Sequence, residues 1–333
     1  MGAVVRGKWP LRFAMGLLAG FGGLYALYSL AKRWQQQQQQ EDRDVGCCQS
    51  KTQNLLRRAI DLGVNSQETE DGHQGHVLVN PHDGLEQQHL QVILDLLRQT
   101  SDTSIRENVL VTIGNSAAFT VNQDLIRNLS GLNVIANCLL DEVTSVKVKA
   151  MNALTNLSLN VANQEELKIW IPQILKIQEA ATLNSELQVA GLRMLTNISV
   201  VSTHHHLMIN YIPHFLKLLV EGTENVKVQA LKILVNLSTD PELTHDLLCA
   251  QVSPLFLLFD NTISKEFLIR MLVFIANLKE NMNLLHDSVP YEYRVESLHS
   301  VIFGNSSQFF QKIASLMLYQ DPEVRQYMAR IIV

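Results

Sequence analysis

The chain has 333 residues, of which 47% are hydrophobic and 18% are charged, so it can bury a core of domain size and is not a disordered polypeptide. Its formal charge is −5, but residues 1–34 carry five cations and no acid, which leaves −10 on the rest. An acidic body argues against nucleic-acid binding, for which a basic surface is usual.

An apolar segment of 19 residues without a formal charge runs from Phe13 to Ala31. As a helix it would be about 28 Å long, close to the roughly 30 Å hydrocarbon layer of a bilayer. It therefore predicts a single-pass membrane anchor within residues 1–34, and its modest hydrophobicity and basic flanks are typical of a mitochondrial outer-membrane signal anchor. The predicted anchor side chains are Phe13, Leu17, Leu18, Phe21, Leu24, Leu27 and Leu30.

A cleaved signal peptide is the alternative for this segment, because Ser29-Leu30-Ala31 has small residues where cleavage would require them. The apolar run is longer than usual for a signal peptide, however, and Lys32-Arg33 follows at once. Charge does not set the orientation, since both flanks are basic. Gly16-x-x-x-Gly20 fits either close association of two such helices or a simple lowering of the hydrophobicity of the segment.

Residues 35–84 are rich in polar residues, begin with six consecutive glutamines and show little helical periodicity. They predict a flexible linker. Cys47-Cys48 fits either a palmitoylated or an unmodified pair. With Cys138 and Cys249 placed singly in helical patterns, the cysteines argue against a disulfide framework and favour a reducing compartment.

One motif recurs through the rest of the chain, from Leu85 to Val333. Its best copies are Ala-Leu-Thr-Asn-Leu-Ser, Met-Leu-Thr-Asn-Ile-Ser and Ile-Leu-Val-Asn-Leu-Ser. The anchoring asparagines are Asn115, Asn156, Asn197, Asn236 and Asn277, with gaps of 41, 41, 39 and 41 residues. A period near 40 in an apolar chain predicts a helical solenoid, because one unit cannot bury its apolar stripe alone.

Each unit contains signals for three helices. In the best-defined unit, Asn163 is expected to cap a short first helix, Pro172 to open a second, and Asn184-Ser185-Glu186 to turn into the third. The following units repeat this pattern around Pro213, Pro241 and Pro254. Strand-like alternation is missing, so we predict an all-α, right-handed superhelical solenoid.

The spacing changes after Asn277. The segment Ser288–Ser297 lengthens the connection before an apolar helix that contains Phe309, Phe310, Ile313, Leu316 and Met317. A last third helix, Glu323 to Val333, is expected to end the chain, as an atypical terminal unit that covers the exposed core.

Units of this kind resemble armadillo repeats. More narrowly, Ile113–Gln123 (Ile-Gly-Asn-Ser-Ala-Ala-Phe-Thr-Val-Asn-Gln) and Lys149–Val161 (Lys-Ala-Met-Asn-Ala-Leu-Thr-Asn-Leu-Ser-Leu-Asn-Val) are similar to the group formed by armadillo repeat-containing protein 10 and its Armcx relatives, with armadillo repeat-containing protein 12 also close. The resemblance implies a protein without enzymatic activity, held in the mitochondrial outer membrane with an armadillo-repeat domain, 85–333, in the cytosol. It also implies protein partners that include mitochondrial Rho GTPases and kinesin adaptors.

In armadillo proteins the third helices line a groove, and the recurrent asparagine often binds the backbone of an extended partner. This role is expected for Asn156, Asn197 and Asn236, and the alternative is that they bond neighbouring repeats. Nuclear-import receptors carry Trp one turn earlier, where this chain has Val111, Asn152, Arg193, Lys232 and Val273. An import function is therefore disfavoured. Arg193 and Lys232 instead predict a groove for an acidic or phosphorylated segment, against the alternative of two solvated cations.

The sequence contains no catalytic motif, phosphate loop or zinc spacing, so we expect neither an enzyme nor a cofactor. His204-His205-His206 is expected to be a polar loop or first-helix turn, because three consecutive residues on a helix cannot converge on one metal ion. The sequence thus favours a membrane-anchored adaptor at the mitochondrial outer membrane. The alternatives are the endoplasmic reticulum membrane, a nuclear or cytosolic scaffold, and a secreted protein cleaved after Ala31.

Overall fold

The structure is a computed structural model that describes residues 87–252, 264–284, 293–304 and 321–332. All of them belong to one compact unit, Glu70–Val333. The predicted anchor between Phe13 and Leu30, the linker with Cys47-Cys48, Pro254 and the apolar helix around Phe309 lie outside the described residues. Among the described helices none is both long enough and apolar enough to cross a membrane.

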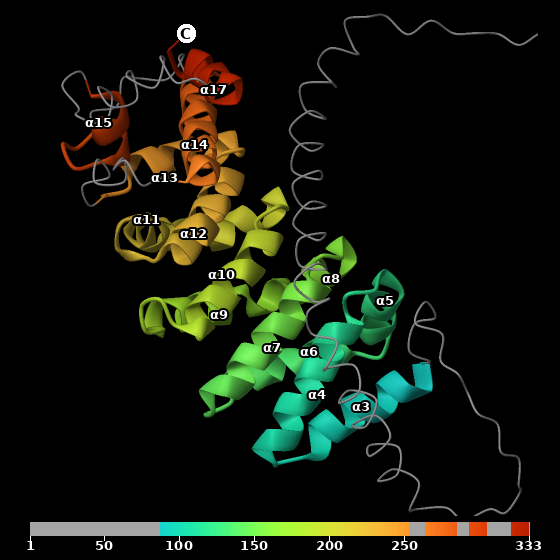
Figure 1. The fold of residues 1–333 in the computed structure, drawn as a ribbon. Helices are drawn as coiled ribbons and strands as arrows, with labels where there is room; N and C mark the ends of the chain where they lie inside the picture. Colours follow the sequence, from blue (N-terminus) through green and yellow to red (C-terminus); the bar gives the residue numbers. More distant parts are fainter. Residues whose placement is uncertain (1–86, 253–263, 285–292, 305–320, 333) are drawn as a thin grey trace, which may run out of the picture. The chain divides into compact units, whose positions relative to one another are not determined.

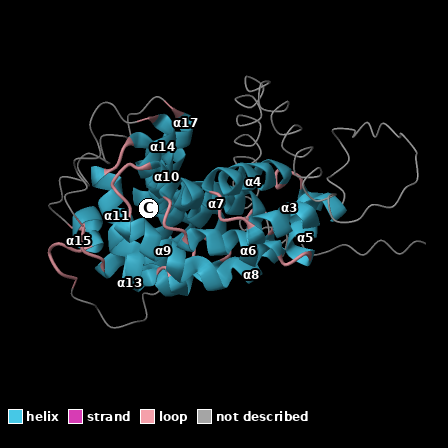
Figure 2. Cartoon of the chain, turned by 90° about the horizontal axis from the view of Figure 1, so that it is seen from below, coloured by secondary structure: helices cyan, strands magenta, loops and turns pink. Residues whose placement is uncertain are grey.

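The first part of the array consists of helices joined by short loops (Figures 1 and 2). In chain order these helices are α3 (Gln87–Gln99), α4 (Thr103–Ser116), α5 (Thr120–Asn128), α6 (Gly131–Asn137), the 3-10 helix η2 (Cys138–Leu140), α7 (Thr144–Leu157), α8 (Val161–Leu167), η3 (Lys168–Trp170), α9 (Ile171–Ala180) and α10 (Glu186–Ile198).

The second part continues in the same manner. Its helices are η4 (Ser202–Leu207), η5 (Ile209–Tyr211), α11 (Ile212–Glu221), α12 (Glu224–Leu237), η6 (Pro241–Leu243), α13 (Thr244–Cys249), α14 (Lys265–Leu284), α15 (Leu298–Phe303) and α17 (Pro322–Ile332). Within the described ranges the only β-type pairing is an isolated bridge between Gln251 and Ser297, so the all-helical prediction is confirmed.

The helices begin where local chemistry favours a start. Pro172 and Pro213 lie at the first positions of α9 and α11, where a missing N–H costs nothing. The Ser185 hydroxyl accepts a hydrogen bond from the backbone N–H of Gln188 and caps α10, and Asn184 before it adopts a left-handed conformation with φ 65°. These predicted boundaries are confirmed.

The third helix of each unit packs against the third helix of the next. α4 lies against α7, α7 against α10, α10 against α12, and α12 against α14, as the row of helices in Figure 1 shows. The residue two positions before each anchoring asparagine is fully buried in this stack; these residues are Ile113, Leu154, Leu195, Leu234 and Ile275. The stack is therefore held by apolar side chains that recur with the sequence period.

The last third helices depart from the pattern. α14 runs to Leu284, seven residues beyond Asn277, where earlier third helices end one residue after their asparagine. α17 packs against α14 and is tied to it by Arg330, whose Nε and Nη2 donate to Glu280 at 2.8 and 2.9 Å. The predicted terminal third helix is thereby confirmed, with Pro322 as its first residue.

Two glycines in third helices provide a matched test of this packing. A Cβ added at Gly191 would lie 1.9 Å from Nε2 of Gln178, a fully buried side chain on α9, whereas a Cβ at Gly114 would lie 3.5 Å from its nearest neighbour, in Ala153. Both substitutions by alanine gain about 0.5–1 kcal/mol of helix propensity.

We expect Gly191→Ala to lower the free energy of unfolding by about 1–2 kcal/mol, because the Gln178 amide must move within a packed interior. Gly114→Ala should leave it unchanged or raise it. Thermal unfolding followed by circular dichroism measures both variants. Equal stabilisation of the two variants would show that α9 and α10 are not in this close contact.

Candidate partner-binding face

The anchoring asparagines tie each third helix to the one before it. Nδ2 of Asn156 donates to the carbonyl oxygen of Gly114 (2.9 Å), and Nδ2 of Asn197 donates to that of Thr155 (2.9 Å). Nδ2 of Asn236 donates to the hydroxyl of Ser199 (2.9 Å). The side chains form a regular ladder of hydrogen bonds across the stack, which we call the asparagine ladder.

These bonds use the Nδ2 group of each amide. For Asn156, Asn197 and Asn236, no hydrogen bond to the side-chain oxygen occurs among the described residues, which leaves an acceptor for another molecule. Asn156 and Asn197 are half-buried and Asn236 is 7% exposed. The predicted contact with a partner thus stays a prediction, and bonding to the neighbouring repeat is a role that each of them has in the structure.

A second set of polar side chains closes the C-terminal ends of the third helices. Nε2 of Gln123 donates to the carbonyl of Ala117 (2.8 Å) and to that of Asn156 in the next unit (3.2 Å). Gln164 does the same one unit later, with Ser158 (2.7 Å) and Asn197 (3.2 Å). Carbonyls at a helix end have no partner within the helix, so these buried glutamines satisfy them and join two units at once.

Asn163 belongs to this second set, and its prediction as a helix cap is wrong. Asn160 caps α8 instead, because its side chain accepts from the N–H of Ala162 (3.0 Å). Asn163 is fully buried, donates to the carbonyl of Leu157 (3.0 Å) and accepts from Nη1 of Arg127 (2.8 Å). The cap lies three residues earlier because only Asn160 is at the extended position that precedes the helix.

The histidine tract occupies the same place in the next unit. It forms η4, as a first-helix turn, but His204 and His205 are buried rather than in a polar loop, and only His206 is exposed. Nε2 of His205 lies 2.7 Å from the carbonyl of Ser199, and its Nδ1 lies 3.2 Å from Oδ2 of Asp240. His204 and His205 thus take the structural places that Asn163 and Gln164 have in the preceding unit. Within the described residues no group of His, Cys, Asp and Glu is arranged to hold a metal ion.

Cations gather where α10, α12 and α14 meet. Arg193 and Lys232 lie four residues before Asn197 and Asn236, at equivalent positions on adjacent helices. Both are half-buried, and neither has a hydrogen bond or ion pair among the described residues; the Nε of Arg193 is fully buried. Arg270 on α14 joins them, with its side chain 16% exposed and its Nη1 2.7 Å from Oε1 of Glu266. We call Arg193, Lys232 and Arg270 the basic cluster.

The half-buried charge of Lys232 is unfavourable for the folded state. Burial lowers the pKa of its ammonium to about 8, and the neighbouring cations Arg270 and Arg193 add to the effect while Glu266 opposes it. Burial also lowers the pKa of Arg270. Perturbed groups of this kind concentrate at functional sites, since selection for stability alone would remove them.

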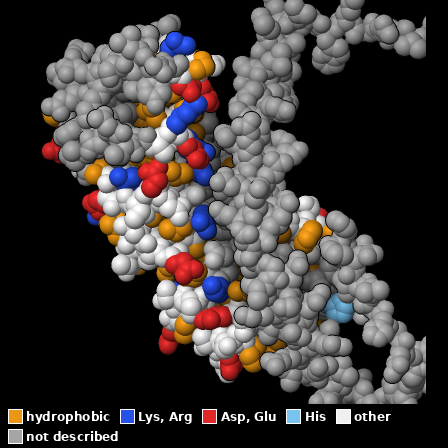
Figure 3. All heavy atoms as spheres, in the orientation of Figure 1, with side chains coloured by type: hydrophobic (Ala, Val, Ile, Leu, Met, Phe, Trp, Pro, Cys, Tyr) orange, Lys and Arg blue, Asp and Glu red, His pale blue; other side chains and the backbone are white. Residues whose placement is uncertain are grey.

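Sequence reasoning located Arg193 and Lys232 but missed Arg270. The equivalent of Lys232 in the next unit is Val273, so a comparison of like positions passes over Arg270, one turn earlier. The electrostatic interaction of Arg270 on α14 with Lys232 on α12 joins positions that are not equivalent in the repeat. Figure 3 shows one face of the molecule, on which Lys and Arg side chains are interspersed with Asp and Glu side chains.

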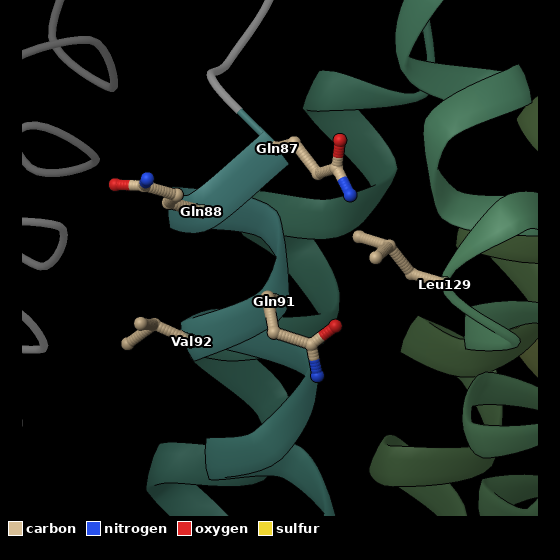
Figure 4. Close-up of a pocket in the computed structure, with 5 residues that line it drawn as sticks. All are labelled: Gln87, Gln88, Gln91, Val92 and Leu129. Carbon is tan, nitrogen blue, oxygen red and sulfur yellow. The ribbon is translucent and has the colours of Figure 1, made fainter.

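A pocket of about 660 Å³ lies apart from this cluster, at the start of the array. Its lining is Gln87, Gln88, Gln91, Val92 and Leu129. Figure 4 shows Gln87 and Gln91 pointing toward Leu129, while Gln88 and Val92 point away on the other side of α3. These five described lining residues carry no ionisable group, so none of them offers an acid, base or nucleophile for catalysis.

Known proteins with this arrangement are armadillo proteins. The model of a family described as Armadillo-like matches residues 85–302. An engineered protein superimposes with a TM-score of 0.60 at 17% identity, covering 74% of this chain, which spans 57% of that protein. A designed armadillo repeat protein in complex with the peptide (KR)4 has a TM-score of 0.58 at 16% identity, with 73% of this chain and 98% of that one covered.

Computationally designed armadillo repeat proteins for modular peptide recognition give a TM-score of 0.58 at 17% identity, with 73% and 98% covered. At such low identity these likenesses concern the fold alone. The solenoid of stacked three-helix units predicted from the period is thereby confirmed, and so is its resemblance to armadillo repeats.

The cost of Lys232 is measurable. Its folded-state pKa of about 8 lies below the ordinary lysine value of 10.5. The charge therefore destabilises the fold fully below pH 8, and this cost disappears as the pH rises toward 10.5. We expect Lys232→Met to raise the free energy of unfolding by about 1–3 kcal/mol at pH 7, and by less at pH 10. Chemical denaturation at both pH values measures the difference.

Lys227→Met is the control, because Lys227 lies on the same helix outside the basic cluster. It should change stability by no more than about 0.5 kcal/mol at either pH. A destabilised Lys232→Met, or a gain that does not depend on pH, would contradict the assignment.

Proposed function

Because the chain belongs to the armadillo-like family, we propose that it is an adaptor that binds protein partners on the face of its third helices. The single observation that carries this proposal is the basic cluster, in which the cationic side chains of Arg193 and Lys232 are half-buried and make no ion pair among the described residues. A bound segment would supply the missing interactions, and the free amide oxygens of the asparagine ladder would accept hydrogen bonds from its backbone.

We further propose that residues 1–34 anchor this adaptor in the mitochondrial outer membrane, with the repeats in the cytosol. The support is the uncharged apolar segment from Phe13 to Ala31 with basic residues on both sides, together with the resemblance to the Armcx group. The adaptor would then regulate mitochondrial distribution, trafficking and dynamics. By the same resemblance, its partners would include mitochondrial Rho GTPases and kinesin adaptors.

Charge distinguishes this face from that of one solved relative. The designed armadillo repeat protein is in complex with the basic peptide (KR)4. The basic cluster of the present chain would repel such a peptide and favour an acidic one. The fold therefore supports binding of an extended segment, and the cluster sets the sign of the charge that the segment must carry.

A scaffold of the endoplasmic reticulum membrane, or a nuclear or cytosolic one that regulates signalling or cell growth, is the second candidate. It is favoured by the modest hydrophobicity of the apolar segment, in which Gly16, Gly20, Gly22 and Gly23 dilute the leucines. Small differences between the hydrophobic length of such a weak anchor and the thickness of the bilayer decide which membrane it enters. The location therefore requires direct observation.

The full chain should localise to mitochondria when imaged in cells, and a chain that lacks residues 1–34 should be diffuse. The reason is that only the deleted part contains an uncharged apolar stretch of 19 residues. Protease treatment of intact mitochondria should digest the repeats of the full chain. An unchanged location after truncation would refute the anchor, and reticular staining would favour the second candidate.

Arg193→Glu/Lys232→Glu should weaken recovery of mitochondrial Rho GTPases by co-immunoprecipitation at least fivefold, because it reverses the charge of the proposed contact. The matched control is Lys176→Glu/Lys217→Glu, which reverses two exposed lysines at equivalent positions on the second helices α9 and α11. Unchanged recovery with the first variant, or an equal loss with the control, would remove the third helices as the binding surface.

A further inference from the structure

The three cations of the basic cluster come from three successive third helices. α10 packs against α12 and α12 against α14, so Arg193 and Arg270 lie on the two helices that pack against the helix of Lys232, and both act electrostatically on its ammonium. Among the described residues, Glu266 is the acid whose charge opposes the lowering of the Lys232 pKa. The formal charge of these four groups is therefore +2, shared among three helices that pack in series.

Most donors of this cluster are unused. The Nε of Arg193 is buried and has no hydrogen-bond partner, and the Lys232 ammonium has neither a hydrogen bond nor an ion pair within the described part of the chain. Arg270 directs Nη1 to Oε1 of Glu266 (2.7 Å) and to its backbone carbonyl (3.3 Å). Two guanidinium groups and an ammonium can thus converge on one group rich in acceptor oxygens.

We propose that the basic cluster is a phosphate subsite, which binds a phosphorylated serine, threonine or tyrosine in the partner segment. This inference rests on the proposed function, because it specifies what the third-helix face recognises. A phosphate monoester carries −1.5 to −2 charges at pH 7 and three acceptor oxygens, so it matches the charge of +2 and the three donors. A single carboxylate would neutralise only half of that charge.

The position of the cluster favours a protein segment over a lipid headgroup. Arg193, Lys232 and Arg270 are half-buried and lie inside their helices, at least five residues from either end, where a flexible chain reaches more readily than a flat membrane surface. Asn197 and Asn236 lie one turn away with side-chain oxygens that accept no hydrogen bond among the described residues. Such oxygens suit the backbone N–H groups beside a phosphorylated residue.

Binding at this subsite is coupled to the protonation of Lys232. A bound dianion raises the pKa of the ammonium from its value of about 8, so the complex takes up a proton above that pH and loses affinity as the pH rises. The charged groups around Lys232 are Arg193 on α10 and Arg270 and Glu266 on α14. The third neighbour, α11, carries His214, Lys217 and Glu221, and the shift at Lys232 arises without them.

The test uses the full chain in lipid nanodiscs and three degenerate peptide libraries that differ only at a fixed central residue: phosphoserine, glutamate or serine. We expect the phosphoserine library to bind at least tenfold more tightly than the glutamate library in fluorescence anisotropy. Arg193→Gln, Lys232→Gln and Arg270→Gln should each lower phosphoserine binding about tenfold, whereas Lys227→Gln, on the same helix as Lys232, should not. Because each substitution removes charge from a self-repelling cluster, we expect the variants to stay folded, so lost binding reports the subsite.

A second readout separates recognition from general attraction. Between pH 7.5 and 9.5 the phosphate is fully ionised, so its own titration does not contribute. Phosphoserine binding should fall threefold to tenfold over this range in the unaltered chain and stay constant in Lys232→Gln. A constant affinity in the unaltered chain would overturn the inference.

Other outcomes overturn it while leaving the proposed function intact. Equal binding of the phosphoserine and glutamate libraries would define a site for acidic segments without phosphate selectivity. Tighter binding to vesicles of phosphatidylcholine with 5% phosphatidylinositol 4,5-bisphosphate than to the phosphoserine library would assign the cluster to a membrane. The proposed function itself fails only if charge reversal at Arg193 and Lys232 leaves recovery of the protein partners unchanged.

Discussion

The hydrogen bonds from Asn156, Asn197 and Asn236 to the preceding third helix are the constraint on which the rest of the structure depends. Apolar stacking holds the repeats together, but it is not directional and tolerates sliding between helices. An amide that must meet one carbonyl, as Asn197 meets Thr155 at 2.9 Å, permits a single register. The buried Gln123 and Gln164 strengthen that register, because each donates to carbonyls at the C-terminal ends of two successive third helices.

The register of the stacked third helices determines where the cations of the basic cluster lie relative to one another. Arg193 and Lys232 lie one turn before their asparagines, so a fixed register on α10 and α12 also fixes the separation of the two charges. The fold bears the resulting repulsion, since burial and Arg270 both lower the pKa of Lys232. A stable stack with a locally destabilising face is the usual compromise of a binding scaffold: rigidity comes from the interior, and recognition from groups that would be better paired.

The features of the fold that depend on local interactions could be predicted from the sequence, and those that depend on tertiary packing could not. Leu154, Leu195 and the asparagines recur with the period, so the third helices and their stacking were predictable, and prolines and serines marked the helix starts. The buried role of Asn163 was not predictable from the sequence, because its hydrogen-bond partners Leu157 and Arg127 are set by tertiary packing. Its one sequence signal was the recurrence of Asn-Gln, Asn-Gln and His-His seven and eight residues after an anchor. Arg270 was missed because its contact crosses between helices.

The asparagine ladder can be tested with a control that the chain itself contains. Asn115 has the same motif position as Asn197 but belongs to the first third helix of the described array; it is exposed and makes no side-chain hydrogen bond there. In denaturant unfolding, Asn197→Ala should lower the free energy of unfolding by about 1–2 kcal/mol, and Asn115→Ala should change it by less than about 0.5 kcal/mol. Equal effects of the two substitutions, or no loss from Asn197→Ala, would contradict the account.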